Sequence, residues 1–166
     1  IRKNLLEYDQ VMNEQRETIY AERRKVLDGQ NLRDDIIKMM KDKIEGYIDY
    51  SINADADPSE WKYAELNENL IRLVPIEPVT LEDGYRNKKE LIQGVEERAV
   101  KFYAEKEAEF PAPEHIREIE RVCLLRAIDT NWMNHIDDME QLRQGVGLQA
   151  YGQRDPLVEY LSLIHI

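Results

Sequence analysis

The chain has 166 residues, enough for one domain or for two small interleaved ones. Hydrophobic residues make up 42% of it and charged residues 34%, a balance typical of long helices with exposed faces. The net charge of −11 argues against free nucleic acid as a partner, because phosphate binding depends on clustered lysine and arginine.

The sequence has few features of a membrane or secreted protein. No apolar run approaches the roughly 20 residues that cross a bilayer, and we find no signal peptide. The single cysteine, Cys123, cannot form an internal disulfide, so we expect a buried apolar residue in a reducing compartment. The chain starts at Ile1, directly in a helical pattern, and ends as abruptly, so we expect a piece of a larger protein.

Residues 1–28 have the pattern of a helix with one apolar seam. A repeat of seven residues predicts that this seam lies against other helices, while basic residues such as Arg23 face solvent. The seam consists of Leu5, Met12, Ile19 and Val26, and Ile1 and Tyr8 lie beside it. The pair Asp28-Gly29 ends the helix, with glycine as the left-handed cap.

Three helices are predicted in the middle of the chain. The first covers residues 32–52, and Asp57 caps the second, which has Pro58 at its first position, includes Trp61 and ends before Pro75. After an irregular loop the third begins near Asn87 and ends at the prolines of 110–113. Its inner face is formed by Leu91, Val95, Ala99 and Phe102.

The strongest periodic signal follows Pro113. Apolar residues recur every three or four positions over about 30 residues, or roughly 45 Å of helix. They are Ile116, Ile119, Val122, Leu125, Ile128, Trp132, Ile136, Met139 and Leu142, and we expect Trp132 to be structural core. No segment alternates with period two for long, so the predicted fold class is all-α.

A glycine-rich segment, 142–156, follows this helix. Gly145, Gly147 and Gly152 predict a tight reversal in which two helices fold back on each other. Tyr151 would lie at or near the turn, at an aromatic tip without acidic residues. One interpretation is a contact role for Tyr151, and the other is an ordinary turn in which it caps the hairpin.

The sequence contains few residue patterns that indicate a catalytic site. His135 and Asp138 lie three residues apart on one predicted helix, but a structural hydrogen bond is the expected role of His135. There is no phosphate-binding loop and no dinucleotide-binding glycine motif after a strand. We therefore expect no catalytic residue, metal or cofactor in this piece.

Both ends of the chain resemble the SecA family, the ATP-driven motors of bacterial preprotein export. Residues 1–16, Ile-Arg-Lys-Asn-Leu-Leu-Glu-Tyr-Asp-Gln-Val-Met-Asn-Glu-Gln-Arg, with Ile19-Tyr20 and Arg23, are similar to the family's long scaffold helix. The second set of residues is similar to its two-helix finger. That set is Asp129, Trp132, His135, 142–145, Leu148, Tyr151, 153–156 and Glu159-Tyr160.

The resemblance implies an all-α fold with a long scaffold helix (1–30), a helical wing subdomain (31–111) and a truncated helical hairpin (112–160). The sequence departs from the family pattern at Gln10 and at Gln149-Ala150, as in a divergent member. Residues 161–166, Leu-Ser-Leu-Ile-His-Ile, match the translation of a common transposase sequencing adapter. We expect these six residues to be a non-native tail.

The resemblance also implies a function. In the family, the scaffold ties nucleotide-binding domains, which bind ATP and Mg, to a preprotein-binding domain, and the finger enters the SecY channel. The implied partners are the SecY channel complex, unfolded preprotein and the rest of SecA, at the cytoplasmic face of the inner membrane. The implied polypeptide contacts at the tip are Gln149, Ala150, Tyr151 and Gly152, and the implied finger turn is Gly145, Gly147 and Leu148.

Two other readings remain open from the residues alone. A standalone helical adaptor would use the hairpin to dock partners and would have no enzymatic activity. A metal or hydrolytic enzyme would need a better constellation than His135 and its acidic neighbours offer.

Overall fold

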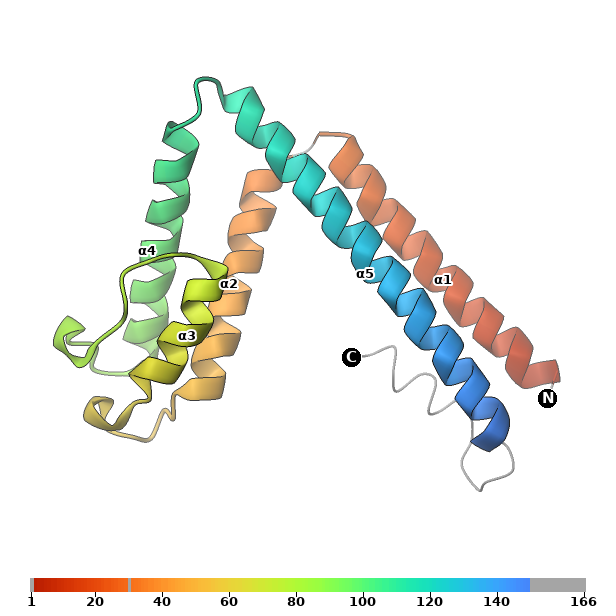
Figure 1. Ribbon diagram of the computed structural model, residues 1–166, viewed down its shortest axis with the longest axis horizontal. Helices are drawn as coiled ribbons and strands as arrows, with labels where there is room; N and C mark the ends of the chain where they lie inside the picture. The colour runs from red at the N-terminus through yellow and green to blue at the C-terminus, as the bar shows by residue number, and fades with distance from the viewer. Residues whose placement is uncertain (1, 30, 150–166) are drawn as a thin grey trace. The chain divides into compact units, whose positions relative to one another are not determined.

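A computed structural model describes residues 2–29 and 31–149, with side chains for 6–29 and 31–145. This part of the chain contains α-helices and two short 3-10 turns but no β-strand, which confirms the all-α class (Figure 1). The helices are α1 (Arg2–Leu27), α2 (Leu32–Ser51), α3 (Tyr63–Leu73), α4 (Lys88–Ala108) and α5 (Pro113–Gln149), and the 3-10 turns are η1 (Pro58–Glu60) and η2 (Leu81–Asp83).

Most helix ends agree with the signals in the sequence. Gly29 follows α1 with a φ of +74°, the left-handed conformation that glycine adopts without strain. The side chain of Asn87 accepts a hydrogen bond from the backbone N–H of Glu90 and caps α4. Pro113 is the first residue of α5, where its missing N–H costs nothing.

The cap at Asp57 is real, but the helix that it starts is shorter than predicted. The Asp57 carboxylate accepts hydrogen bonds from the backbone N–H and the hydroxyl of Ser59, and η1 ends at Glu60. Trp61 then takes an extended backbone with ψ of 144°, and α3 begins only at Tyr63. This break in the helix accompanies burial of the Trp61 ring in the core.

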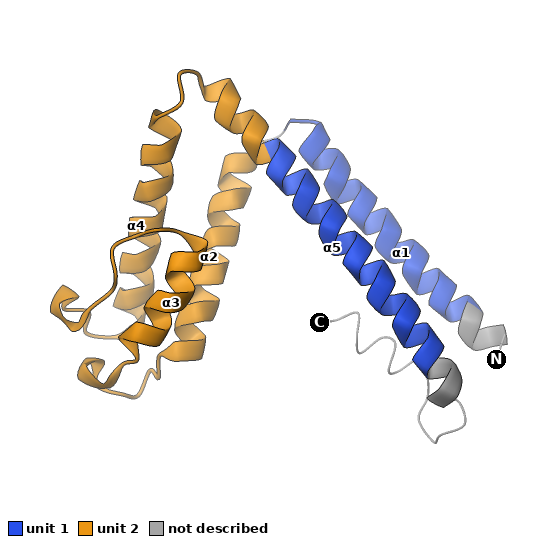
Figure 2. Cartoon of the chain, viewed as in Figure 1, with its two compact units in different colours: residues 1–30, 121–166 blue, residues 31–120 orange. Residues whose placement is uncertain are grey.

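The chain divides into two compact units (Figure 2). Unit 1 comprises residues 1–30 and 121–166, and unit 2 comprises residues 31–120, so the first two turns of α5 belong to unit 2. Unit 2 has one apolar core, to which α2, α3 and α4 each present the face that the periodicity predicts. Its buried members are Met40, Ile44, Ile48, Ile52, Trp61, Leu66, Leu70, Val74, Val79, Leu91, Val95 and Ala99.

Side-chain hydrogen bonds fix the irregular segment between α3 and α4 onto this core. The amide of Asn67 pairs with the backbone of Val79 in both directions, each hydrogen bond measuring 2.8 Å. Arg98 on α4 forms an ion pair of 2.9 Å with Asp83. Val79 is thereby completely buried although it lies in a loop.

Candidate interaction surface on the α1–α5 pair

Within unit 1, α1 and the 121–149 part of α5 run side by side in opposite directions (Figure 1). At one end of the pair, Tyr8 and Met139 are 4% and 1% exposed and form a small apolar cluster. The half-buried side chains around them are Val11, Met12 and Leu142. The predicted seam is therefore confirmed at Met12 and, beside it, at Tyr8, while the side chain of Leu5 lies outside the described residues.

Polar contacts continue the pairing along the two helices. His135 Nε2 donates a hydrogen bond of 2.7 Å to Gln15 Oε1, which confirms a structural role for this histidine. The imidazole also stacks on the indole of Trp132, with the ring centroids 5.7 Å apart and the planes inclined by 29°.

A bidentate ion pair between Arg23 and Asp129 joins α1 and α5 farther along, beyond the contact of His135 with Gln15. Arg23 Nε donates to Asp129 Oδ1 at 2.9 Å and Arg23 Nη2 to Asp129 Oδ2 at 3.3 Å. The hydrogen bond to Asp129, and then its charge, raise the pKa of Arg23. Arg23 was expected to face solvent, and its side chain is 40% exposed, but that expectation did not include the ion pair with Asp129. Both residues occur in the family-like motifs, and that was the available signal.

One face of the helix pair is hollowed by a groove of about 630 Å³. Ile19 and Ile128 contribute apolar surface to it, while Gln15, Thr18 and His135 contribute polar groups. Trp132 also lines the groove and is half-buried, so the expectation that it is core is too strong. The reason is that the described part of unit 1 has two helices and no third layer to cover the indole.

The opposite face of the pair exposes large apolar side chains. Successive residues turn by about 100° around an α-helix, which puts these side chains about a third of a turn from the seam on each helix. Because the helices are antiparallel, the two stripes fall on the same face, away from Thr18 and Asn131 of the groove. The stripe of α1 is Leu6, Tyr20 and Leu27, and that of α5 is Val122, Met133 and Ile136.

Four expectations about burial on α5 are therefore wrong. Val122 and Ile136 belong to the apolar stripe that predicted a core face, yet both are exposed, as is Cys123. Ile119, in the part of α5 that belongs to unit 2, is exposed as well. An apolar period marks a face that avoids water, but it does not say which chain covers that face.

The helix α5 is also longer than the glycines predicted. It continues through Gly145, Gly147 and Leu148 and ends at Gln149, so these residues do not form the turn. Glycine in a helix costs only about 1 kcal/mol relative to alanine, which a long helix tolerates. The tip residues Ala150, Tyr151 and Gly152 lie outside the described residues, as does the side chain of Gln149.

The described part of the chain has neither a membrane-spanning helix nor a metal-binding cluster. None of its helices combines the length and the apolar character needed to cross a membrane. Over the same residues, histidine, cysteine and carboxylate side chains nowhere gather in a group of three that could hold a metal ion.

Comparison with known proteins gives the family. A family model described as the SecA Wing and Scaffold domain matches residues 1–162. Protein translocase subunit SecA of Lachnoclostridium phytofermentans is 61% identical over 163 residues, which cover 96% of this chain and 19% of that protein. Those of Desulforamulus reducens and Acetivibrio thermocellus are 46% and 44% identical over 166 residues, covering 96% of this chain and 18% of each protein. The chain thus spans about a fifth of the length of the curated relatives it matches. It belongs to the SecA family of protein translocase subunits and matches the wing and scaffold domain of that family.

Proposed function

We propose that this chain is the wing and scaffold part of an ATP-driven preprotein translocase. In this proposal the α1–α5 pair is the scaffold. One of its faces packs on the nucleotide-binding and preprotein-binding domains, and the end of α5 leads to a finger that contacts polypeptide in the SecY channel. ATP and Mg bind to those other domains, and the assembly works at the cytoplasmic face of the inner membrane.

The exposed apolar face of the pair is the observation that carries the scaffold role. Met133 is 68% exposed and shares its face with Tyr20, Leu27 and the other members of the two stripes. Several large apolar side chains exposed on one face of a helix pair are typical of a surface that is covered in the complete protein. The relatives are about five times as long as this chain, so they contain ample further structure to cover it.

The length of α5 and the position of its last described residue support the finger role. α5 is a single helix of 37 residues, and its last described residue, Gln149, is two positions before Tyr151. A long helix can hold an aromatic tip well away from the surface on which the scaffold packs. Tyrosine suits contact with passing polypeptide, because its ring and hydroxyl accept many side chains and backbone groups.

Met133→Glu tests the scaffold role, with Asn134→Glu on another side of α5 as the control. In the isolated chain the exposed Met133 can be replaced within about 0.5 kcal/mol of the parent stability. In a full-length SecA that carries this sequence, the same change would place a carboxylate in an apolar interface. We expect a lower melting temperature and uncoupled ATP hydrolysis there. An unchanged full-length protein would exclude this face as an internal interface.

Tyr151→Ala tests the finger role in the same full-length protein. We expect impaired translocation of a model preprotein with basal ATP hydrolysis largely preserved, because Tyr151 would be remote from the nucleotide. A photocrosslinker at position 151 should label preprotein or channel during transport. Normal translocation by the variant, or labelling of neither partner, would contradict the role of the tip.

The standalone adaptor is distinguished by the genomic locus. An upstream reading frame that encodes a nucleotide-binding core, continuous with Ile1, is expected for the translocase. A start codon immediately before Ile1, with no such core upstream, is expected for an adaptor.

A further inference from the structure

The side of α2 that points away from the core of unit 2 is exposed from Asp35 to Tyr50. Successive residues of an α-helix turn by about 100°, and six residues of α2 fall within an arc of about that width, opposite its buried residues Ile44 and Ile48. All six are exposed. They are Asp35, Met39, Asp42, Gly46, Asp49 and Tyr50, and we call them the α2 face.

Two large side chains of the α2 face are in contact with water. Met39 is 55% exposed and Tyr50 is 79% exposed, whereas Met40, the next residue after Met39, is only 9% exposed. Removing such side chains from water would stabilise the protein. Because apolar residues that are exposed singly are common, Met39 and Tyr50 do not define a binding surface without further observations.

Gly46 leaves the middle of the α2 face without a side chain. A Cβ at this position would meet nothing within 4 Å, so packing in the described residues does not require a glycine there. The backbone does not require it either, because positive φ angles occur only at Gly29 and Gly84 among the described residues. Glycine destabilises the interior of a helix relative to alanine, but it allows another backbone to approach closely.

A row of carboxylates runs beside these residues. Asp35, Asp42 and Asp49 are spaced by seven positions, so they lie almost in line along about 21 Å of helix. Asp49 pairs with Lys88 of α4 at 2.6 Å and is still 62% exposed. None of the basic side chains in the described residues forms an ion pair with Asp35 or Asp42. In paired helices, charges at this spacing beside an apolar seam select a partner of opposite charge.

We propose that the α2 face docks an amphipathic helix that carries an apolar seam and, on one flank, lysine or arginine at seven-residue spacing. The seam covers Met39 and Tyr50, the backbone of the docked helix approaches Gly46, and its basic flank pairs with Asp35 and Asp42. The helix belongs to the same polypeptide, outside this chain. This chain covers 19% of its relative from Lachnoclostridium phytofermentans, so about four fifths of the complete protein is available to supply it.

The α2 face lies in unit 2, so its role is separate from the scaffold and finger roles proposed for the α1–α5 pair. It rests on only one part of the proposed function, namely that this chain is a segment of a full-length SecA. Normal behaviour of Met133→Glu and Tyr151→Ala would exclude the scaffold and finger roles without changing the coverage of the α2 face.

Hydroxyl-radical footprinting, read by mass spectrometry, tests whether the α2 face is covered. Exposed methionine and tyrosine side chains are oxidised readily, so Met39 and Tyr50 report on it directly. We expect both to react in the isolated chain and to be oxidised roughly threefold more slowly, or less, in a full-length SecA that carries this sequence. Met40 should be unreactive in both proteins, and Ile71 of α3, which is 63% exposed, should react equally in both.

Three footprinting results would overturn the inference. Equal oxidation of Met39 and Tyr50 in the two proteins would show that the α2 face stays open. Slow oxidation already in the isolated chain would show that this chain covers the face itself. Protection of Ile71 to the same degree as Met39 would indicate general coverage of unit 2 rather than docking on α2.

Two variants of the full-length protein test the chemistry of the docked helix. Asp42→Lys reverses the charge in the middle of the acidic row, and Gly46→Leu fills the place that the approaching backbone needs. We expect each variant to restore most of the oxidation of Met39 and Tyr50. In the isolated chain, Gly46→Leu should not lower the melting temperature, because a side chain there meets no neighbour and leucine favours a helix more than glycine does.

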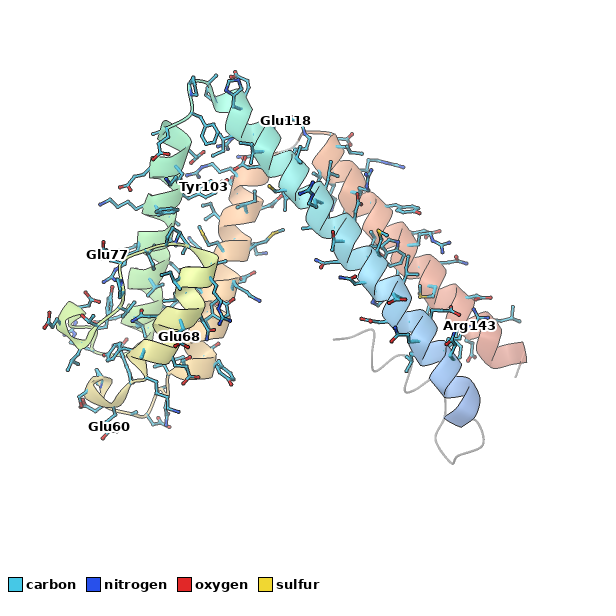
Figure 3. All side chains as sticks on the ribbon, in the orientation of Figure 1. Glu60, Glu68, Glu77, Tyr103, Glu118 and Arg143 are labelled. Atoms are coloured by element: carbon cyan, nitrogen blue, oxygen red, sulfur yellow. The ribbon has the colours of Figure 1, made fainter. Side chains whose placement is uncertain are left out.

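Glu68→Lys is the matched control for the charge reversal. Glu68, labelled on α3 in Figure 3, is exposed, and its replacement changes the net charge as much as Asp42→Lys does. We expect protection of Met39 and Tyr50 in Glu68→Lys as in the parent. Equal loss of protection in Glu68→Lys and Asp42→Lys, or full protection in both Asp42→Lys and Gly46→Leu, would overturn the inference.

Dilution of the full-length protein identifies where the docked helix comes from. A helix of the same polypeptide is held at a high effective concentration, so it protects the α2 face equally in dilute and concentrated samples. A helix from a second copy would protect it only in the concentrated sample. Protection of Met39 and Tyr50 that disappears on dilution would therefore overturn the inference.

Discussion

The two units differ in how they remove apolar side chains from water. In unit 2, Ile44, Leu66 and Val95 have no exposed surface, and α2, α3 and α4 surround them. In unit 1 the described residues form two helices, with a small cluster at Tyr8 and Met139 and polar contacts along the rest of the pair. Unit 2 has the construction of a domain that can fold alone. The described part of unit 1 leaves large apolar side chains such as Met133 and Tyr20 exposed.

Leu66→Ala in α3 should have the largest effect on unit 2. Leu66 is completely buried in the core, so loss of its side chain leaves a cavity and costs about 2–5 kcal/mol of unfolding free energy. Urea unfolding followed by circular dichroism measures this. The control is Ile71→Ala in the same helix, because Ile71 is 63% exposed and should change stability by less than about 0.5 kcal/mol. Equal effects of the two would mean that unit 2 is not packed as described.

The two tryptophans allow the units to be followed separately in the isolated chain. Trp61 is buried in the core of unit 2, and Trp132 lines the groove of unit 1. Trp132→Phe leaves the first as the only reporter, and Trp61→Phe leaves the second. We expect the Trp132 transition at a urea concentration lower by about 1 M, equivalent to roughly 1–3 kcal/mol. If the Trp61 and Trp132 transitions coincide, unit 1 and unit 2 unfold as one cooperative unit. The proposed difference in stability between the two units would then be wrong.

The periodic pattern predicted the helices well because it reports a physical requirement of every buried helix face. Leu91, Val95 and Ala99 were expected on the inner face of α4, and all three are buried. The same pattern was misleading at Val122 and Ile136, where the apolar face is real but no described residue covers it. A sequence of this length shows which face avoids water and leaves the covering partner unspecified.

The long-range polar contacts could not be predicted from local patterns. Asn67 and Val79, or Arg23 and Asp129, meet only after the helices have packed, and the periodicity around each residue does not indicate its partner. The turn predicted at Gly145 is absent for a different reason. Glycine permits a turn but does not require one, and α5 has continued through it.

Gly94 and Gly46 give a pair of substitutions with opposite expected signs inside unit 2. A Cβ at Gly94 would lie 2.3 Å from the hydroxyl oxygen of Tyr85, whereas a Cβ at Gly46 would meet nothing within 4 Å. Gly46→Ala should stabilise α2 by roughly 0.5–1 kcal/mol. Gly94→Ala should destabilise by about 1–3 kcal/mol, because the ring of Tyr85 must move.

Thermal melts of the two alanine variants measure these effects, and Tyr85→Ala supplies the control. In the Tyr85→Ala background the clash is absent, so Gly94→Ala should become stabilising like Gly46→Ala. If Gly94→Ala destabilises equally with and without the tyrosine ring, close packing of the loop on α4 is not the cause.

The smallest effect concerns a carboxylate pair between α2 and α4. Burial, and then the neighbouring carboxylate of Glu45, raise the pKa of Glu96, with a smaller contribution from Asp42 and opposition from Lys41. A carboxyl whose pKa is higher in the folded state favours folding while it is protonated, and this contribution is lost as the pH rises through the raised pKa.

Glu96→Gln should therefore raise the melting temperature slightly at pH 7, and this gain should shrink toward zero at pH 4, where the parent Glu96 is itself becoming neutral. Glu97→Gln, an exposed neighbour on α4, removes the same formal charge from the chain and corrects for its net charge of −11. A gain of the same size in both variants at both pH values would mean that general repulsion, rather than the pairing of Glu45 with Glu96, limits the stability of unit 2.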